Sequence, residues 1–336
     1  MSYDKPWISY FEQLQQLKDR GLIVTDDERA LAYLERIGYY RLSGYWYSFR
    51  ERTGAYCPLE AEGRKKFKRG KTNHLTLDSF KSGASFQQAV DLYVFDKRLR
   101  LLVLDALERI EVGLRVDIAH TIGRLDALAY LKPELLHSEF STVIDQQTGL
   151  TSLHRWQEKH ARLINRSGEA FIQHNKAKYG LPLPIWIACE VWDFGTLSHL
   201  YAGMRTEEQD DISSKYSIAN GRVFASWLRS LNYLRNVCAH HSRLWNRNML
   251  DQPKKPGRGE APLFEDAWGN GHIQARPFIV FCIAQFLLQT INPSSSWWQR
   301  LTDLLNDFPD LEALGLNLKG MGAIDGWESW EWNIGQ

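Results

Sequence analysis

Apolar residues recur at helical spacing over most of the chain. The clearest case is 85–123, where every third or fourth position is apolar and no proline intervenes, which predicts one long helix with a buried face. The segment 277–290 is apolar on all sides and predicts a buried helix. Alternating patterns are scarce, so the chain is expected to be all-α. Further helices are predicted at 11–20, 26–37, 156–175, 186–200, 210–216, 222–248 and 296–307.

Cap residues indicate where some of these helices begin and end. Thr25 with Glu28 three residues later is typical of a capping box and predicts the start of the second helix. Gly123 is a good terminator for the long helix, and Gly113 is a weak point within it.

Two segments near the N-terminus have open interpretations. Residues 39–47 read YYRLSGYWY, an aromatic cluster that either packs against the main body or offers rings on which RNA bases stack. Residues 64–71 read RKKFKRGK, a run of six cations that is either a solvated loop or a sequence-independent grip on phosphates.

Composition restricts the function classes only weakly. The 336 residues carry a formal net charge of +1, so any affinity for nucleic acid has to be local. Four scattered cysteines form no C-x-x-C pair, and we expect no disulfide framework, no metal site and no cofactor. No secretory signal and no run of 18 apolar residues is visible, which predicts a cytoplasmic protein without membrane contact.

The segment 222–248 is the most informative helix prediction. Drawn as a wheel, its apolar side gathers Trp227, Leu231, Leu234, Cys238 and Trp245. The opposite side carries cations and amides, with Arg235 at its edge; the members of this stripe are Arg229, Asn232, Asn236, His240, Arg243 and Arg247. His241 falls on the apolar side and is expected in the core.

Charge and residue type together suggest RNA chemistry on this stripe. Residues 222–258 hold eight Lys or Arg and one acid, Asp251, which is typical of a surface that binds an anion such as phosphate. His240 can move protons near neutral pH, and Arg235 can stabilise charge on a phosphoryl group, while RNA supplies its own 2′-hydroxyl nucleophile. Asn236, one turn before His240, can orient the ring. A generic anion-binding or purely structural surface explains the same spacing.

Glu111 and Arg115 lie four residues apart on the long helix. They are either an ordinary intrahelical ion pair or a supporting pair beside the site, because the long helix should pack next to the segment 222–248.

Five motifs resemble one known family. Residues 234–247 read LRNVCAHHSRLWNR and resemble the signature of the Abi-type abortive-infection proteins, the AbiD/AbiF group, which carry a HEPN domain. The other motifs agree in order; they are IGYYRLSGYW at 37–46, YVFDKRLR at 93–100, LERIEVGLR at 107–115 and PIWIACEVWDFGTLS at 184–198. The resemblance covers about residues 10–250.

The resemblance implies a HEPN-type helical bundle and, in many members, a metal-independent ribonuclease with an R-x4-6-H motif. Here that motif would be Arg235, Asn236 and His240. HEPN nucleases usually combine two domains, and one motif is present in this chain, so a homodimer is implied. The group is also associated with phage resistance and toxin–antitoxin behaviour, in some cases with a small RNA as the restraining partner.

Three regions and three functions are therefore predicted. The regions are an N-terminal helical region (1–75), the HEPN bundle (76–292), and a C-terminal helix and tail (293–336). The leading function is an endoribonuclease in which Arg229, Asn232, Arg243 and Arg247 hold RNA. The alternatives are a non-catalytic protein that pairs with a structured small RNA, and a toxin that acts through protein contacts alone.

Overall fold

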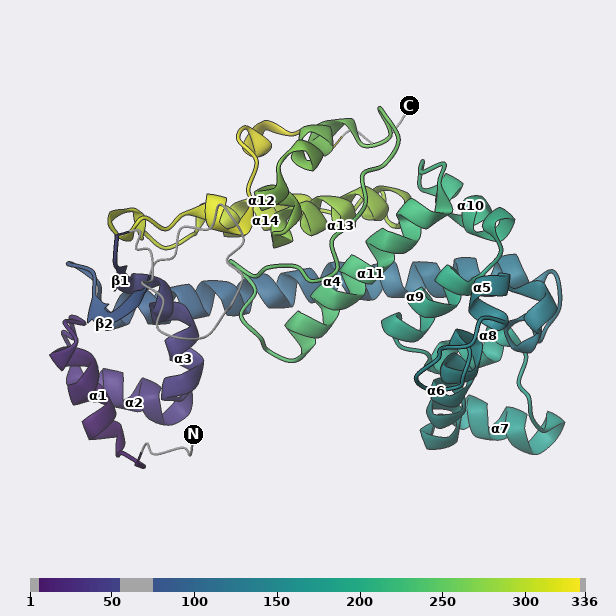
Figure 1. Cartoon of the computed structure of the whole chain (residues 1–336), viewed down its shortest axis with the longest axis horizontal. Coiled ribbons are helices and arrows are strands. Elements are labelled where there is room, and N and C mark those ends of the chain that lie inside the picture. Colours follow the sequence, from purple (N-terminus) through teal and green to yellow (C-terminus); the bar gives the residue numbers. More distant parts are fainter. Residues whose placement is uncertain (1–5, 55–74, 333–336) are drawn as a thin grey trace, which may run out of the picture. The chain divides into compact units, whose positions relative to one another are not determined.

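Helices are the main secondary structure of the protein in the computed structural model, which describes residues 6–54 and 75–332 (Figure 1). The all-α prediction is confirmed, since the described sheet consists of two short antiparallel strands, β1 (Arg50–Arg52) and β2 (Thr76–Phe80). The cationic run at 64–71 lies outside the described residues. The described residues divide into two compact units, one formed by 6–54, 75–98 and 304–318, the other by 99–303 and 319–332. The three regions predicted from sequence stay a prediction.

The first unit contains the first three α-helices of the chain, the two strands, the start of the long helix and the segment 304–318. The helices are α1 (Tyr10–Asp19), α2 (Asp27–Arg36) and α3 (Tyr39–Trp46). A capping box starts α1, because Ser9 Oγ accepts from the backbone N–H of Glu12 while the Glu12 carboxylate accepts from that of Ser9. The predicted cap of α2 was wrong by one residue: Asp26, not Thr25, accepts from Arg29 N–H at 3.0 Å.

The aromatic segment 39–47 is divided between core and surface. Tyr45 and Trp46 are buried with Leu42, and the Tyr45 hydroxyl donates to the buried Asp96 carboxylate at 2.7 Å. Packing therefore explains this half of the segment. Tyr40 and Tyr47 remain exposed.

The long helix α4 (Phe86–Gly123) has the predicted length and passes through Gly113 without a break. A Cβ at Gly113 would lie 3.1 Å from the side chain of Ile291, so the glycine allows close packing of another helix. The other α-helices of the described residues are α5 (Ser138–Ser141), α6 (Ser152–Arg166), α7 (Ala170–Tyr179), α8 (Ile185–Ala188), α9 (Phe194–Gly203), α10 (Thr206–Lys215), α11 (Gly221–Ala239), α12 (Gly271–Gln274), α13 (Pro277–Ile291) and α14 (Trp297–Asn306).

In the second unit, α11 packs against α9, α10 and α13, and α13 is buried almost throughout, as predicted. Two predicted helices are in fact broken. The segment 156–175 is interrupted between α6 and α7 near Gly168. The segment 186–200 ends early in α8, and α9 restarts because the Asp193 side chain accepts from Thr196 N–H at 2.8 Å.

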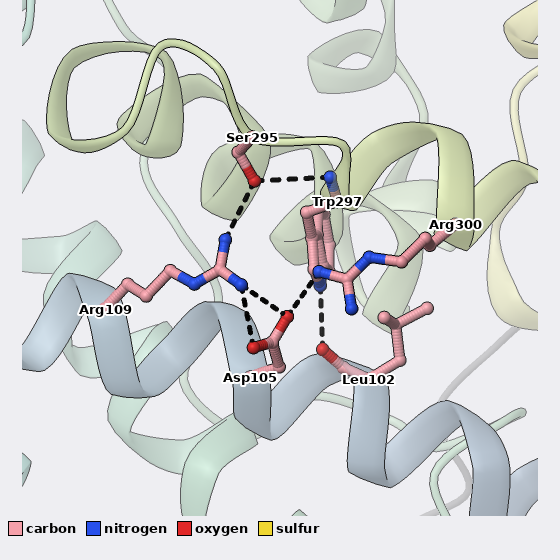
Figure 2. A network of polar contacts seen from close by, with 6 residues as sticks. All are labelled: Leu102, Asp105, Arg109, Ser295, Trp297 and Arg300. Atoms are coloured by element: carbon pink, nitrogen blue, oxygen red, sulfur yellow. Dashed lines mark hydrogen bonds and ion pairs between the residues drawn. The ribbon is translucent and has the colours of Figure 1, made fainter.

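A polar network fixes the start of α14 against α4 (Figure 2). The Asp105 carboxylate accepts from Arg109 at 2.9 Å and from Arg300 at 2.6 Å. The Trp297 indole N–H donates to the Leu102 carbonyl at 2.7 Å, while its ring is buried. Polar pairing and aromatic burial therefore act at the same joint.

Candidate functional site

The helix α11 carries the residues singled out from sequence. Asn220 caps its start, with Oδ1 accepting from the backbone N–H of Arg222 and Val223. Gly221 follows and lies so close to α10 that a Cβ there would be 2.5 Å from the Gln209 Cβ. An apolar face of Phe224, Leu228, Leu231 and Leu234 is fully buried. Packing on this face fixes which side of α11 reaches solvent.

The end of α11 differs from the prediction. The helix stops at Ala239, and His240 is its C-cap, so the predicted continuation to residue 248 was wrong. His241 adopts φ +55°, and Ser242 N–H donates to the Val237 carbonyl at 3.0 Å while His241 N–H donates to Cys238. This pair of bonds is a Schellman motif, which usually has glycine at the left-handed position.

The turn after Ala239 exposes His241 and is held by a contact from another helix. His241 is exposed rather than part of the core, because the left-handed turn points its side chain away from the apolar face. A buried guanidinium, that of Arg100 on α4, donates to the Ser242 carbonyl at 3.4 Å and holds the turn from outside the helix.

Arg243 and Arg247 consequently do not continue the polar stripe of α11. Both are half-buried in the segment after the helix. Arg247 Nε donates to the Tyr233 hydroxyl at 3.0 Å, and its guanidinium lies 5.8 Å from the centre of that ring. Burial lowers the pKa of Arg276, and the positive charge of nearby Arg243 lowers it further.

Arg235 lies at a cavity of about 420 Å³ between α11 and α4. The opposite wall is a stripe of α4 that includes Glu108, Glu111 and Arg115. The structure therefore brings Arg235 together with both members of the Glu111–Arg115 pair. His240 is not among the lining residues.

Glu111 is the electrostatic centre of this cavity. Burial raises the pKa of its carboxyl, and the positive charges of Arg235 and Arg115 oppose that shift. Arg115 is itself held in place, with Nη2 donating to the Trp192 carbonyl at 3.2 Å and lying 3.4 Å from Glu111. The pair is thus both an intrahelical ion pair and a wall of the Arg235 cavity.

Arg235 and His240 point in different directions from α11. Five residues along a helix correspond to a rotation of about 500°, which separates the two side chains by about 140°. His240 is exposed at the helix end, and Asn236 and Arg235 are half-buried. The Asn236 backbone carbonyl accepts from His240 N–H at 3.0 Å, and no hydrogen bond between the two side chains is seen in the described part of the chain.

Three cations form a basic cluster beside the α11 stripe, and two of them are paired with carboxylates, Arg155 with Asp145 and Lys159 with Asp193. Partial desolvation, and then the charges of Lys159, Arg155 and Arg229, lower the pKa of the exposed His199. Of these three cations, only Arg229 was predicted from the sequence to bind RNA. The four-residue spacing of Arg155 and Lys159 on α6 was the signal that could have indicated this face.

Asn232 lies at the margin of the same region. A Cβ on Gly195 would be 3.3 Å from the Asn232 amide oxygen and 3.4 Å from an Asp193 carboxylate oxygen. Asp193 also pairs with Lys159 at 2.8 Å. The amide therefore faces the start of α9 rather than open solvent alone.

Comparison with known proteins assigns the chain to a family. A family model described as Abi-like protein matches residues 32–246, more than half of the chain. The chain belongs to this family. No curated protein and no solved structure matches. Membership of the Abi-like family associates the chain with abortive infection.

The Abi-like match begins within α2 and ends in the segment after α11. It includes every candidate residue except Arg247, which follows it immediately. No group of three or more His, Cys, Asp or Glu side chains that could hold a metal ion is found in residues 6–54 and 75–332. No described helix of this Abi-like protein has the length and apolar character needed to cross a membrane.

Proposed function

We propose that this Abi-like protein is a metal-independent endoribonuclease of the HEPN type, related to the AbiD/AbiF group and acting in phage defence. The observation that carries the proposal is the arrangement of α11: an exposed His240 at its end, Arg235 on a charged cavity, and a basic cluster that Arg229 of α11 forms with Arg155 and Lys159 of α6. His240 moves the proton of the 2′-hydroxyl or of the leaving oxygen. Arg235 stabilises the phosphorane-like transition state.

RNA would lie along the basic part of α11. Arg229, with Lys159 and Arg155 on α6, supplies cations that bind backbone phosphates without reading sequence. Glu111 and Arg115 would keep the Arg235 guanidinium in place, because a partly buried carboxylate between two guanidiniums restrains both.

Because Arg235 and His240 diverge on one helix, we propose that a second copy of the chain completes the site. Arg235 of one copy would act with His240 of the other. Complementation tests this idea: Arg235→Ala and His240→Ala, each inactive alone, are mixed in equal amounts. If subunits exchange randomly, half of the dimers are mixed and each retains one intact site, so about a quarter of the wild-type activity should return. No recovery, with mixed dimers present, contradicts the shared site.

The reaction itself is tested with total RNA in EDTA. The wild-type protein should leave 2′,3′-cyclic phosphate and 5′-hydroxyl ends, and His240→Ala should abolish cleavage while retaining RNA affinity. His174→Ala, which removes an exposed histidine from α7, is the matched control and should cleave normally. Full activity of His240→Ala, or an absolute need for a divalent metal, would end the proposal.

The basic cluster favours one alternative, a non-catalytic protein that pairs with a structured small RNA. The Lys159, Arg155 and Arg229 cations would bind such an RNA with or without cleavage. Binding with a steep salt dependence, together with no cleavage of any RNA by the wild-type protein, would select this alternative.

A further inference from the structure

The first unit contains a cavity with an unusual wall. It has a volume of about 490 Å³ and is lined by three tyrosines, Tyr39, Tyr40 and Tyr47, together with the side chains of Arg20 and Arg50. This volume lies in the range of roughly 300–1,000 Å³ that is typical of small-ligand sites. The wall combines aromatic rings with guanidinium groups.

The spacing of α3 explains why Tyr40 faces outward. Leu42, Tyr45 and Trp46 are buried in the core of the unit, which leaves the opposite side of the helix to solvent. Tyr40 is 78% exposed and Tyr47 is 48% exposed. Large rings with this exposure contribute little to the core, so core packing does not account for them.

The polar groups of the cavity have unused hydrogen-bonding capacity. Gln13 Nε2 donates to the Ile8 carbonyl, while Gln13 Oε1 has no partner. Arg50 Nη1 pairs with the exposed Asp78 at 3.2 Å, yet Arg50 Nε has no partner, and its guanidinium lies 5.9 Å from the Tyr47 ring centre. Both atoms are buried, so the wall holds an unsatisfied amide oxygen and an unsatisfied guanidinium N–H beneath its surface.

We propose that this cavity binds an unpaired base of a single-stranded RNA. Tyrosine faces stack on bases of any sequence, and Arg20 and Arg50 can meet the adjoining phosphate. A purely apolar ligand would leave the guanidiniums of Arg20 and Arg50 unused. The proposal goes beyond the cleavage reaction, because base binding here requires neither His240 nor Arg235.

The test uses the full-length protein and a fluorescein-labelled uridine 12-mer that contains 4-thiouridine. Anisotropy should show that Tyr40→Ala/Tyr47→Ala lowers affinity at least about tenfold, since base–aromatic stacking supplies that much per base. Tyr40→Phe/Tyr47→Phe keeps the rings and should bind like the wild type. Tyr179→Ala, which removes an exposed tyrosine from α7 in the other unit, is the matched control.

Photocrosslinking gives an independent readout. Irradiation followed by peptide mapping should place adducts within residues 39–50, and duplex RNA should compete poorly because its bases are paired. Equal binding by Tyr40→Ala/Tyr47→Ala and Tyr179→Ala, adducts only outside 39–50, or equal competition by duplex RNA would each overturn the proposal. If the double variant does not fold, Tyr40→Ala alone decides, since that side chain is largely in solvent.

Cleavage by the same variants separates this proposal from the nuclease. If the wild type binds RNA without cleaving it, and Tyr40→Ala/Tyr47→Ala no longer binds, the base-binding cavity is supported and the nuclease proposal is contradicted. If Tyr40→Ala/Tyr47→Ala cleaves normally and binds RNA with unchanged affinity, the nuclease proposal is supported and the base-binding cavity is contradicted.

Discussion

Acidification should destabilise the second unit through His160. This α6 side chain is 9% exposed, stacks on the Trp156 ring with a centroid distance of 5.5 Å, and accepts from the Trp192 indole N–H at Nδ1, 2.9 Å away. Burial lowers the pKa of His160 from 6.5 to about 4. The ring is therefore neutral in the folded protein at pH values where it is charged in the unfolded chain.

The size of the effect follows from that difference. Each pKa unit corresponds to about 1.4 kcal/mol, so His160 contributes about 3 kcal/mol to the free energy of unfolding. This contribution is present above the pKa of the unfolded chain and is lost as the pH falls toward about 4. Between pH 7 and pH 5 the loss should be about 2 kcal/mol. Solvent screening takes little from this value because the ring is buried.

His160→Gln isolates the contribution, because the amide oxygen can still accept from the Trp192 indole while the side chain no longer titrates. Urea unfolding of the wild type and the variant at pH 7 and pH 5, followed by tryptophan fluorescence, gives two pH differences. On acidification from pH 7 to pH 5, the free energy of unfolding should fall by about 2 kcal/mol less in the variant than in the wild type, although the variant is less stable at pH 7. His174→Gln should retain the wild-type dependence. Equal pH differences in His160→Gln and the wild type would refute the reasoning.

Three further substitutions test how α11 and its cavity are built. Gly221→Ala should lower the free energy of unfolding in urea by about 3 kcal/mol, because the new Cβ meets the Gln209 Cβ at 2.5 Å. Gly168→Ala, with open space around it, is the control, and an equal loss in both variants would argue against the close approach. His241→Gly should raise stability by about 1 kcal/mol, since glycine adopts the left-handed φ without strain; a loss of stability would contradict this account of the turn. Glu111→Gln should abolish the loss of stability that the wild type shows as the pH rises through the elevated pKa of this carboxyl, because the amide does not titrate. An unchanged pH profile of unfolding just above the usual glutamate range would count against burial of this carboxyl.

Sequence periodicity predicted most helices because their burial is set by local spacing. The long helix α4 and the buried α13 were predicted within a residue or two at each end. The breaks between helices were not predicted where a tertiary contact or a capping residue determines the end of a helix. Asp193 restarts a helix within an apolar run, and α11 ends at a left-handed histidine that no glycine or proline announces.

The candidate site was predictable as chemistry but not as geometry. Residue types and charge on 222–248 identified Arg235 and His240, and the expected packing of the long helix beside this segment added Glu111 and Arg115 as possible neighbours. The wheel assumed an unbroken helix and therefore placed Arg243 and Arg247 on the stripe. Their actual place after Ala239 depends on the Arg100 contact, whose partner is 142 residues away in sequence. Such a contact has no local signature.

Division of a site between two copies would also give this protein a means of control. A single chain separates Arg235 from His240 by about 140° around α11, so the monomer would lack a complete pair. At low concentration the population of complete sites then rises with the square of the monomer concentration, because each site needs two copies. Activity per molecule should fall steeply on dilution in the wild type, and a linked tandem of two chains should lose that dependence. A monomer that cleaves at full rate after dilution below its dimerisation constant would show that α11 supplies both groups by itself.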